Sequence, residues 1–204
     1  MIFDFDGTIA DSRDRVLAEY NRIAPRFRVR PIDPEDVPRL RTLSGRAAMK
    51  EHGLSFWKLP FLVSAMRAAL REHAASLEPH RGMAEALASL AAAGCRLSIL
   101  STNSRENIER FLARHELSMF EHVAGGSSMF GKARALARLV DRLELDPARA
   151  FYVGDEIRDI EAAATAGLRS IAVTWGYADP AALARHTPTY IAEDPGDLVR
   201  LVHA

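Results

Sequence analysis

The sequence predicts an α/β protein with a Rossmann-like parallel sheet as its core and a small all-α cap domain inserted after the first strand. From residue 81 onward, short apolar runs alternate with patterns of helical spacing, which is typical of a parallel sheet that helices cover on both faces. Between residues 13 and 78, apolar residues keep only the helical period. We therefore expect an α/β core made of residues 1–12 and 79–204 and a helical cap made of residues 13–78.

The elements of the core follow from apolar runs and from the residues that interrupt them. The first strand is the apolar start of the chain before Asp4, and Gly94 ends a helix over 83–93. Ser104 suits the N-cap of a helix that ends near residue 115, and Gly167 ends a later helix. The other predicted strands are 96–100, 121–124, 151–153, 170–175 and 190–192, and the other predicted helices are 132–143 and 197–203.

The cap pattern consists of helices of unequal length. Ser12 offers an N-cap for a helix that ends before Pro25. Prolines and glycines between residues 31 and 53 allow only short helices, over 35–43 and 46–52. A longer helical pattern spans residues 56–77, and within it we place Phe56, Trp57 and Phe61 in the interior of the cap.

Composition narrows the classes of partner. With 204 residues, 48% of them hydrophobic, the chain can bury a sizeable core. Lys and Arg total 27, as do Asp and Glu, so there is no basic surplus for binding a nucleic-acid backbone. Cys95 is the single cysteine, and no apolar run approaches the roughly 18 residues of a membrane span. We expect a cytoplasmic protein that binds neither nucleic acid nor a membrane, and the sequence leaves its oligomeric state open.

The first candidate for chemistry is the run from Asp4 to Thr8, where the first strand ends. Asp4 and Asp6 are two residues apart, so an extended chain sends both carboxylates the same way. Two carboxylates so close need a hard cation such as Mg²⁺ or a split in their pKa values. Gly7 permits a sharp turn with amides near an anion, and Thr8 adds a hydroxyl. The alternative is an ordinary Asp-Gly turn at the end of a strand.

Three further polar segments stand at predicted ends of strands or starts of helices. They are Ser101 to Asn103, Gly131 with Lys132, and Asp155 to Asp159. In open α/β sheets the ligand lies beyond the carboxyl ends of the strands, where such loops converge. Lysine is scarce in this chain, with three against 24 arginines, which favours a specific role for Lys132 over a surface position. A carboxylate nucleophile, a hydroxyl, an ammonium and further carboxylates together fit phosphoryl transfer.

The four segments, in this order, resemble the motifs of the haloacid dehalogenase superfamily of aspartate-nucleophile phosphatases. The runs Asp-Gly-Thr-x-x-Asp-Ser and Tyr-Val-Gly-Asp-Glu-x-Arg-Asp-Ile are similar to those of phosphoglycolate-phosphatase-like members. The resemblance implies that Asp4 attacks phosphorus and that Asp6 is the general acid and base. It also implies that Ser101 holds the phosphoryl oxygens and that Lys132 bridges nucleophile and phosphate. A shift of one residue would give the role of Ser101 to Thr102, and the sequence leaves this open.

The same resemblance implies a cofactor and the residues around it. It assigns Mg²⁺ to Asp4, Asp6 through its main-chain carbonyl, Asp155 and Asp159, with Asp159 as an outer residue that orients Lys132 or a metal-bound water. Glu156 and Arg158 are expected to face away or to pair on the helix surface. The predicted substrate-binding residues are Gly7, Thr8, Thr102, Asn103 and, in the cap, Arg46.

The predicted function is Mg²⁺-dependent hydrolysis of a small phosphorylated metabolite through an aspartyl phosphate, with phosphoglycolate or a similar small acid phosphate as substrate. Arg39, Arg41, Arg46 and Lys50 make the cap cationic, which favours a substrate with a second anionic group. Three alternatives stay open: a sugar-phosphate phosphatase, a β-phosphoglucomutase-like phosphomutase and a non-catalytic binding protein on the same fold. Mutases of that type carry a cap histidine twelve residues past the nucleophile, where this chain has Val16.

Overall fold

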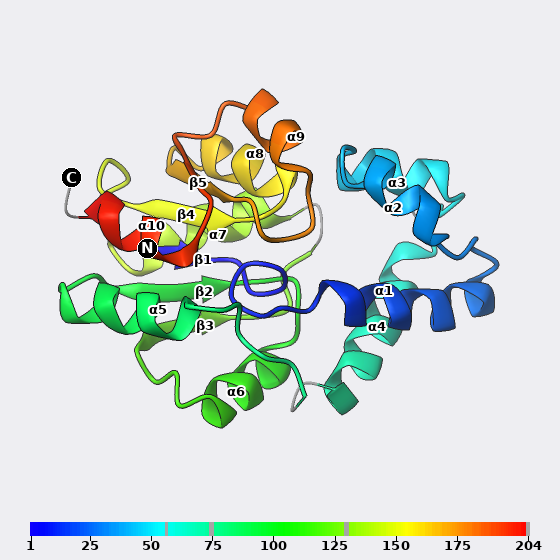
Figure 1. Ribbon diagram of the computed structural model, residues 1–204, viewed down its shortest axis with the longest axis horizontal. Helices are drawn as coiled ribbons and strands as arrows, with labels where there is room; N and C mark the ends of the chain where they lie inside the picture. Colours follow the sequence, from blue (N-terminus) through cyan, green and yellow to red (C-terminus); the bar gives the residue numbers. More distant parts are fainter. Residues whose placement is uncertain (56, 74–75, 129–130, 203–204) are drawn as a thin grey trace.

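The core of the molecule is a parallel sheet in the order β3-β2-β1-β4-β5-β6. The computed structural model describes residues 1–55, 57–73, 76–128 and 131–202 (Figure 1). The strands are β1 (Ile2–Phe3), β2 (Leu97–Leu100), β3 (Phe120–Ala124), β4 (Phe151–Gly154), β5 (Arg169–Val173) and β6 (Tyr190–Ala192). The strand order reverses between β1 and β4. In open α/β sheets the segments that follow two such strands diverge, and ligands bind between them at the carboxyl ends of the strands. The predicted α/β fold with a parallel sheet is confirmed.

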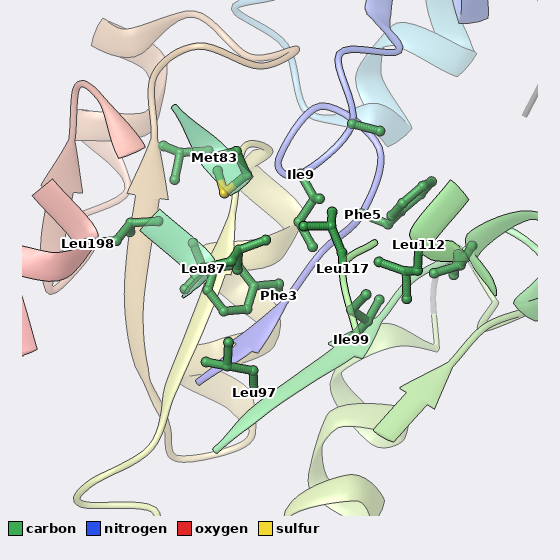
Figure 2. Close-up of a cluster of buried hydrophobic side chains, with 14 of the residues drawn as sticks. Phe3, Phe5, Ile9, Met83, Leu87, Leu97, Ile99, Leu112, Leu117 and Leu198 are labelled. Atoms are coloured by element: carbon green, nitrogen blue, oxygen red, sulfur yellow. The ribbon is translucent and has the colours of Figure 1, made fainter. Parts of the chain in front are cut away.

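Alternate residues of the central strands face the two helical layers. Phe3, Leu97 and Ile99 pack with α5 (Met83–Ala92), α6 (Arg105–Arg114) and α10 (Pro195–Val202), and Figure 2 shows part of this cluster. Ile2 and Tyr152 pack on the other face, with α7 (Lys132–Arg142) and α8 (Ile157–Thr165). Because burial of each such side chain stabilises the fold by about 1.5–3 kcal/mol, the two-residue strand β1 is held firmly despite its length.

Residues 13–78, here called the helical insertion, contain only helices and turns in their described part. These are α1 (Arg13–Ile23), α2 (Val37–Leu40), α3 (Gly45–Glu51), α4 (Leu59–His73) and the 3₁₀ turns Ala24–Phe27 and Pro34–Asp36. The insertion has its own apolar cluster, which includes Ile23, Leu54 and Leu62. Figure 1 shows α1 to α4 grouped at one side of the sheet. Whether the insertion is an independent domain stays a prediction.

The insertion leaves and rejoins the core at one place. Ala10 forms an antiparallel bridge with Pro79, and the amide of Asp11 donates to the carbonyl oxygen of Glu78 at 2.9 Å. The entry and exit of a segment of more than sixty residues therefore lie side by side. Among the described helices, none is long and apolar enough to cross a membrane.

One predicted helix was wrong in extent, and one short helix was not predicted. The helix predicted over 56–77 begins at Leu59 and ends at His73, because Pro60 fits the first turn of a helix but not its interior. The short helix α9 (Pro180–Arg185) was not predicted, although Asp179 caps it by accepting from the amides of Ala181 and Ala182.

The interior position predicted for the aromatic residues of the cap was also wrong. Trp57, which precedes α4, is 82% exposed, and Phe61, in the first turn of α4, is 68% exposed. Phe56 lies outside the described residues. The helical periodicity predicted that a helix is present, but it did not predict which residues near the start of that helix are buried.

Candidate active site

The loop after β1 is a tight turn that Gly7 makes possible. Its φ of 78° lies in the left-handed region, and its amide donates to the carbonyl oxygen of Ala10 at 2.9 Å. A Cβ atom at Gly7 would lie 2.2 Å from Cδ2 of Tyr177 and 2.4 Å from Oδ2 of Asp155. A larger residue could not occupy this position without moving the loops that follow β4 and β5.

Three buried carboxylates and one ammonium meet beyond β1 and β4. Ligand atoms of Asp4, Asp155 and Asp159 lie within 4.8 Å of one another. Lys132, at the start of α7, places Nζ 2.6 Å from Oδ2 of Asp4 and 2.5 Å from Oδ1 of Asp159. Burial alone would lower the pKa of Lys132, but Asp159 and Asp4 outweigh it and raise the pKa well above its usual value. Lys132 is therefore a fixed positive charge beside Asp4.

Asp155 is oriented by two donors from different loops. Its Oδ1 accepts from the hydroxyl of Thr8, and its Oδ2 accepts from the amide of Tyr177, both at 2.7 Å. Burial, followed by the neighbouring carboxylates Glu156, Asp159 and Asp4, raises the pKa of Asp155 well above its usual range. Such a cluster of buried carboxylates, with one ammonium among them, fits a divalent cation that prefers oxygen ligands.

Asp159 serves Lys132 more directly than it serves a metal. One carboxylate oxygen contacts Lys132, and the other accepts from the amide of Glu156 at 3.0 Å as part of a capping box at the start of α8. Burial raises the pKa of Asp159 to about 6, with Lys132 acting in the opposite sense. With both oxygens engaged, the side chain is suited to orient the ammonium. Glu156 and Arg158 pair with each other as expected, but the pair is half-buried beside the site and not on the helix surface.

Asp6 occupies a different environment from Asp4. Its side chain is half-buried, and Oδ2 accepts from the side-chain amide of Asn103 at 2.9 Å. Its Oδ1 is buried and has no hydrogen-bond partner among the described residues. Burial, followed by the charge of Asp4, raises the pKa of Asp6 to about 6, although the hydrogen bond from Asn103 lowers it. A carboxyl group with this pKa can both donate and accept a proton near neutral pH.

The loop after β2 supplies the support for Asp6. The oxygen of Asn103's side chain accepts from the amide of Ser104 and from the side chain of Asn107, so its orientation is fixed. Ser101 is buried, and its hydroxyl accepts from the amide of Asn103 at 3.1 Å. Thr102 is half-buried. The choice between Ser101 and Thr102 as the phosphate-binding hydroxyl stays a prediction.

The other predicted substrate contacts lie at different distances from this cluster. Gly7 and Thr8 direct their amide and hydroxyl donors to other parts of the loops, so their contribution in this structure is to position Asp155 and the turn. Arg46 is exposed on α3 and lines a cavity of about 430 Å³ together with Lys132 and Arg158. These substrate contacts stay predictions.

Sequence reasoning missed several residues that hold the site together. Trp175 donates from Nε1 to the carbonyl oxygen of Thr8 at 3.0 Å, and Nε2 of His80 lies 3.1 Å from the carbonyl oxygen of Gly7. Tyr177 places its amide on Asp155. Trp175 and Tyr177 follow β5, so the rule that loops after strands form the site could have found them. His80 carried no such signal.

The geometry and the comparisons with known proteins agree. A family model described as haloacid dehalogenase-like hydrolase matches residues 1–173, and this chain belongs to that family. It is 43% identical, over 99% of this chain and 96% of the relative, to a phosphoglycolate phosphatase from Synechococcus elongatus. It is 24% identical to the pyrophosphatase PpaX from Bacillus velezensis, over 98% of this chain and 94% of the relative.

A solved structure extends the agreement to the fold. A haloacid dehalogenase-like family hydrolase from Streptococcus pneumoniae superposes with a TM-score of 0.81 at 21% identity, covering 98% of this chain and 96% of that chain. At that identity the likeness concerns the fold alone. The predicted family and fold are thus confirmed.

Proposed function

We propose that the chain is a Mg²⁺-dependent phosphatase that hydrolyses a small phosphomonoester, with phosphoglycolate as the leading substrate. The observation that carries the proposal is the placement of Lys132 between Asp4 and Asp159, with Asp6 held by Asn103 at the same edge of the sheet. The 43% identity to a phosphoglycolate phosphatase supports the substrate.

In the first step, Asp4 attacks the phosphorus atom. A bond forms between a carboxylate oxygen and phosphorus, and the bond from phosphorus to the leaving oxygen breaks. Asp6 gives its proton to that oxygen, which leaves as an alcohol. Lys132 offsets negative charge on the phosphoryl group and on Asp4 throughout. The environments of the two aspartates match these two roles: Asp4 is paired with Lys132, whereas Asp6 has its pKa raised to about 6 by burial and has an oxygen, Oδ1, without a hydrogen-bond partner among the described residues.

In the second step, water hydrolyses the aspartyl phosphate. Asp6, now ionised, takes a proton from the water molecule while the water oxygen bonds to phosphorus. The bond from phosphorus to Asp4 breaks, which releases inorganic phosphate and restores the carboxylate. The hydrogen bond from Asn103 keeps Asp6 in one orientation for both proton transfers.

The residues present suit a bound Mg²⁺ ion. Asp4, Asp155 and the main-chain carbonyl of Asp6 would hold it, since Asp159 is already engaged by Lys132 and Glu156. The ion would supply positive charge that neutralises the phosphoryl oxygens. Burial and the neighbouring carboxylates raise the pKa of Asp155, and a cation beside Asp155 would offset both effects, which supports this assignment.

The cationic residues of the helical insertion do not all serve one purpose. Arg39 pairs with Asp36 and Glu51, and Arg41 donates to main-chain carbonyls of the core. Arg46 lines the cavity that also contains Lys132 and Arg158. Nη1 of Arg158 is buried and has no hydrogen-bond partner among the described residues.

Arg46 and Arg158 line the same cavity as Lys132, which supports a second anionic group in the substrate, bound between these two arginines. An arginine suits a carboxylate better than a neutral hydroxyl. A phosphomutase is disfavoured because Val16 lines an apolar cavity and cannot move a proton. A cytoplasmic location also stays a proposal.

The substrate is tested by comparing kcat/KM for 2-phosphoglycolate and for ethyl phosphate, which lacks the carboxylate, in the presence of Mg²⁺. We expect the wild type to prefer phosphoglycolate and Arg46→Ala to reduce that preference by about tenfold, as for a lost charged hydrogen bond. Arg39→Ala is the matched control, because it removes a nearby arginine that pairs on the surface. A wild-type preference for ethyl phosphate, or an equal loss on both esters in Arg46→Ala, would reject the anionic tail.

A further inference from the structure

Arg67 of α4 reaches from the helical insertion to the loops of the core. Its Nε donates to the carbonyl oxygen of Thr102 at 2.8 Å, and its Nη2 donates to the carbonyl oxygen of Ser127 at 3.1 Å. Those two loops are already joined, since the amide and hydroxyl of Ser127 both donate to the carbonyl oxygen of Ser101. One guanidinium thus fixes the peptide that lies between Ser101 and Asn103.

A second connection runs from the backbone of the same residue. The side-chain amide of Asn107 donates to the carbonyl oxygen of Arg67 at 3.2 Å and to Oδ1 of Asn103 at 2.9 Å. Asn103 in turn donates to Asp6 at 2.9 Å. Arg67 therefore contacts both neighbours of Asn103 in this network, Thr102 through its side chain and Asn107 through its backbone. Figure 1 shows α4 on the side of the insertion that is nearest to α6, which carries Asn107.

We propose that Arg67 is a positioning residue that makes proton transfer by Asp6 depend on the position of the helical insertion relative to the core. When Arg67 binds the carbonyl oxygens of Thr102 and Ser127, the Thr102–Asn103 peptide is fixed and Asn103 orients Asp6 toward the leaving oxygen. With the insertion displaced, both donors of Arg67 and the acceptor for Asn107 are withdrawn. The inference rests on the proposed phosphatase function. It gives a role to a residue that acts on the loop of Asn103 and does not itself touch the substrate.

Arginine suits this role for a physical reason. Its guanidinium stays charged at any pH at which proteins fold, and it presents several donors in a rigid fork that can span two carbonyl oxygens. Hydrogen bonds from a charged donor are stronger than those between neutral groups. A lysine at the same position would keep the charge but could not reproduce the planar fork.

The next turn of α4 supplies a matched control. Arg71 lies four residues further on and faces Glu106 at 3.5 Å, with both side chains about half exposed. It contacts the same helix, α6, but no carbonyl of the Ser101–Asn103 loop in the described structure. A general loosening of α4 against α6 would therefore be produced by Arg71→Ala as well, whereas a specific effect on Asp6 would not.

The test uses two substrates that differ in their need for a proton. The leaving oxygen of 2-phosphoglycolate departs as an alcohol and needs the proton of Asp6, whereas acetyl phosphate releases a stable carboxylate and does not. For Arg67→Ala we expect kcat/KM to fall about 10- to 100-fold on 2-phosphoglycolate, a part of what general acid catalysis contributes, and to fall much less on acetyl phosphate. Arg67→Lys should recover part of the loss, and Arg71→Ala should resemble the wild type on both substrates.

A second measurement does not depend on activity. Amide hydrogen exchange of residues 101–107 should be faster in Arg67→Ala than in the wild type and unchanged in Arg71→Ala, with Arg67→Gln as the substitute if the alanine variant does not fold. Equal losses of kcat/KM on both substrates, or unchanged exchange in these residues, would overturn the proposal. If the wild type hydrolyses neither ester while the exchange result holds, the phosphatase function fails and the loop contact of Arg67 stands.

Discussion

The ion pairs of the core loops are buried, whereas pairs such as Arg39 with Asp36 in the helical insertion are exposed. Around Asp4, Lys132 and Asp159, side chains pair with side chains, and each is no more than 3% exposed. In the insertion, pairs such as Arg39 with Asp36 lie at the surface, with Arg39 51% exposed. Removing one partner of a buried pair costs about 3–5 kcal/mol, whereas surface pairs contribute about 0–1 kcal/mol.

This contrast indicates where each part of the function resides. The core loops fix the chemistry, because their charged side chains are buried and depend on one another as partners. The insertion can exchange surface charges at little cost, so substrate preference can change without loss of the fold. Arg41 and Arg67 are exceptions in the insertion, since they leave its surface to bind carbonyl oxygens of the core.

The largest expected effect is that of Asp4→Asn, which tests the core side of this comparison. An amide cannot attack phosphorus, so turnover of phosphoglycolate with Mg²⁺ should be abolished. The variant should still fold, because Asp159 remains as a partner for Lys132. Asp11→Asn, at an exposed carboxylate of the same loop, is the control and should keep its activity. Near-normal turnover in Asp4→Asn would end the aspartyl-phosphate mechanism.

Asp6→Asn should reduce kcat by roughly 10²- to 10⁴-fold, which is the usual contribution of general acid–base catalysis. The oxygen of the new amide can still accept from Asn103, so the loop should keep its shape. Because the base for the second step is also lost, a slowly hydrolysing phosphoenzyme should accumulate and be visible by mass spectrometry. A kcat equal to that of the wild type would show that Asp6 has another role.

Addition of Mg²⁺ should stabilise the wild type against unfolding, because the ion offsets the carboxylate excess around Asp155. At a hundred times its Kd, the ion should add about 2.7 kcal/mol to the free energy of unfolding. Asp155→Asn should lose this gain, although its oxygen can still accept from Thr8 and Tyr177. A Mg²⁺-dependent rise in Tm of the same size in both proteins would place the ion elsewhere.

The smallest expected effect separates two arginines of the insertion. Arg41 donates to the carbonyl oxygens of Gly176, Tyr177 and Ala178, and charged hydrogen bonds contribute about 1.5–3 kcal/mol. Urea denaturation should therefore show a loss in this range for Arg41→Ala and a loss below about 1 kcal/mol for Arg39→Ala. Equal losses would mean that the contrast between surface and docking arginines does not hold.

The sequence predicted the core better than the insertion, for physical reasons. β6 was predicted with its observed bounds, and α7 begins at Lys132 as expected, because apolar alternation and glycine breaks act locally. The site aspartates and Lys132 could be grouped because parallel strands bring their carboxyl ends to one edge. The start of α4 was missed because Pro60 outweighed the apolar pattern before it.

Other residues of the site were out of reach of sequence reasoning. Arg67 binds main-chain oxygens, and every residue has one, so no pairing of residue types marks the contact. The hydrogen bond from the amide of Tyr177 to Asp155 also uses a backbone group, so the residue type at position 177 does not predict it. The hydrogen bond from the side chain of Asn103 to Asp6 depends on side-chain orientation, which the sequence does not give, and the predicted contact of Asn103 with the substrate stays a prediction.

The bridge between Ala10 and Pro79 makes the helical insertion a natural unit of exchange. Because its two ends already lie hydrogen bonded to each other, a cut there would leave a gap that a short turn could close, with the sheet untouched. Gene fusions could therefore graft the insertion of one relative onto the core of another. Docking through backbone carbonyls would survive such a graft, since any recipient core presents the same acceptors whatever its side chains.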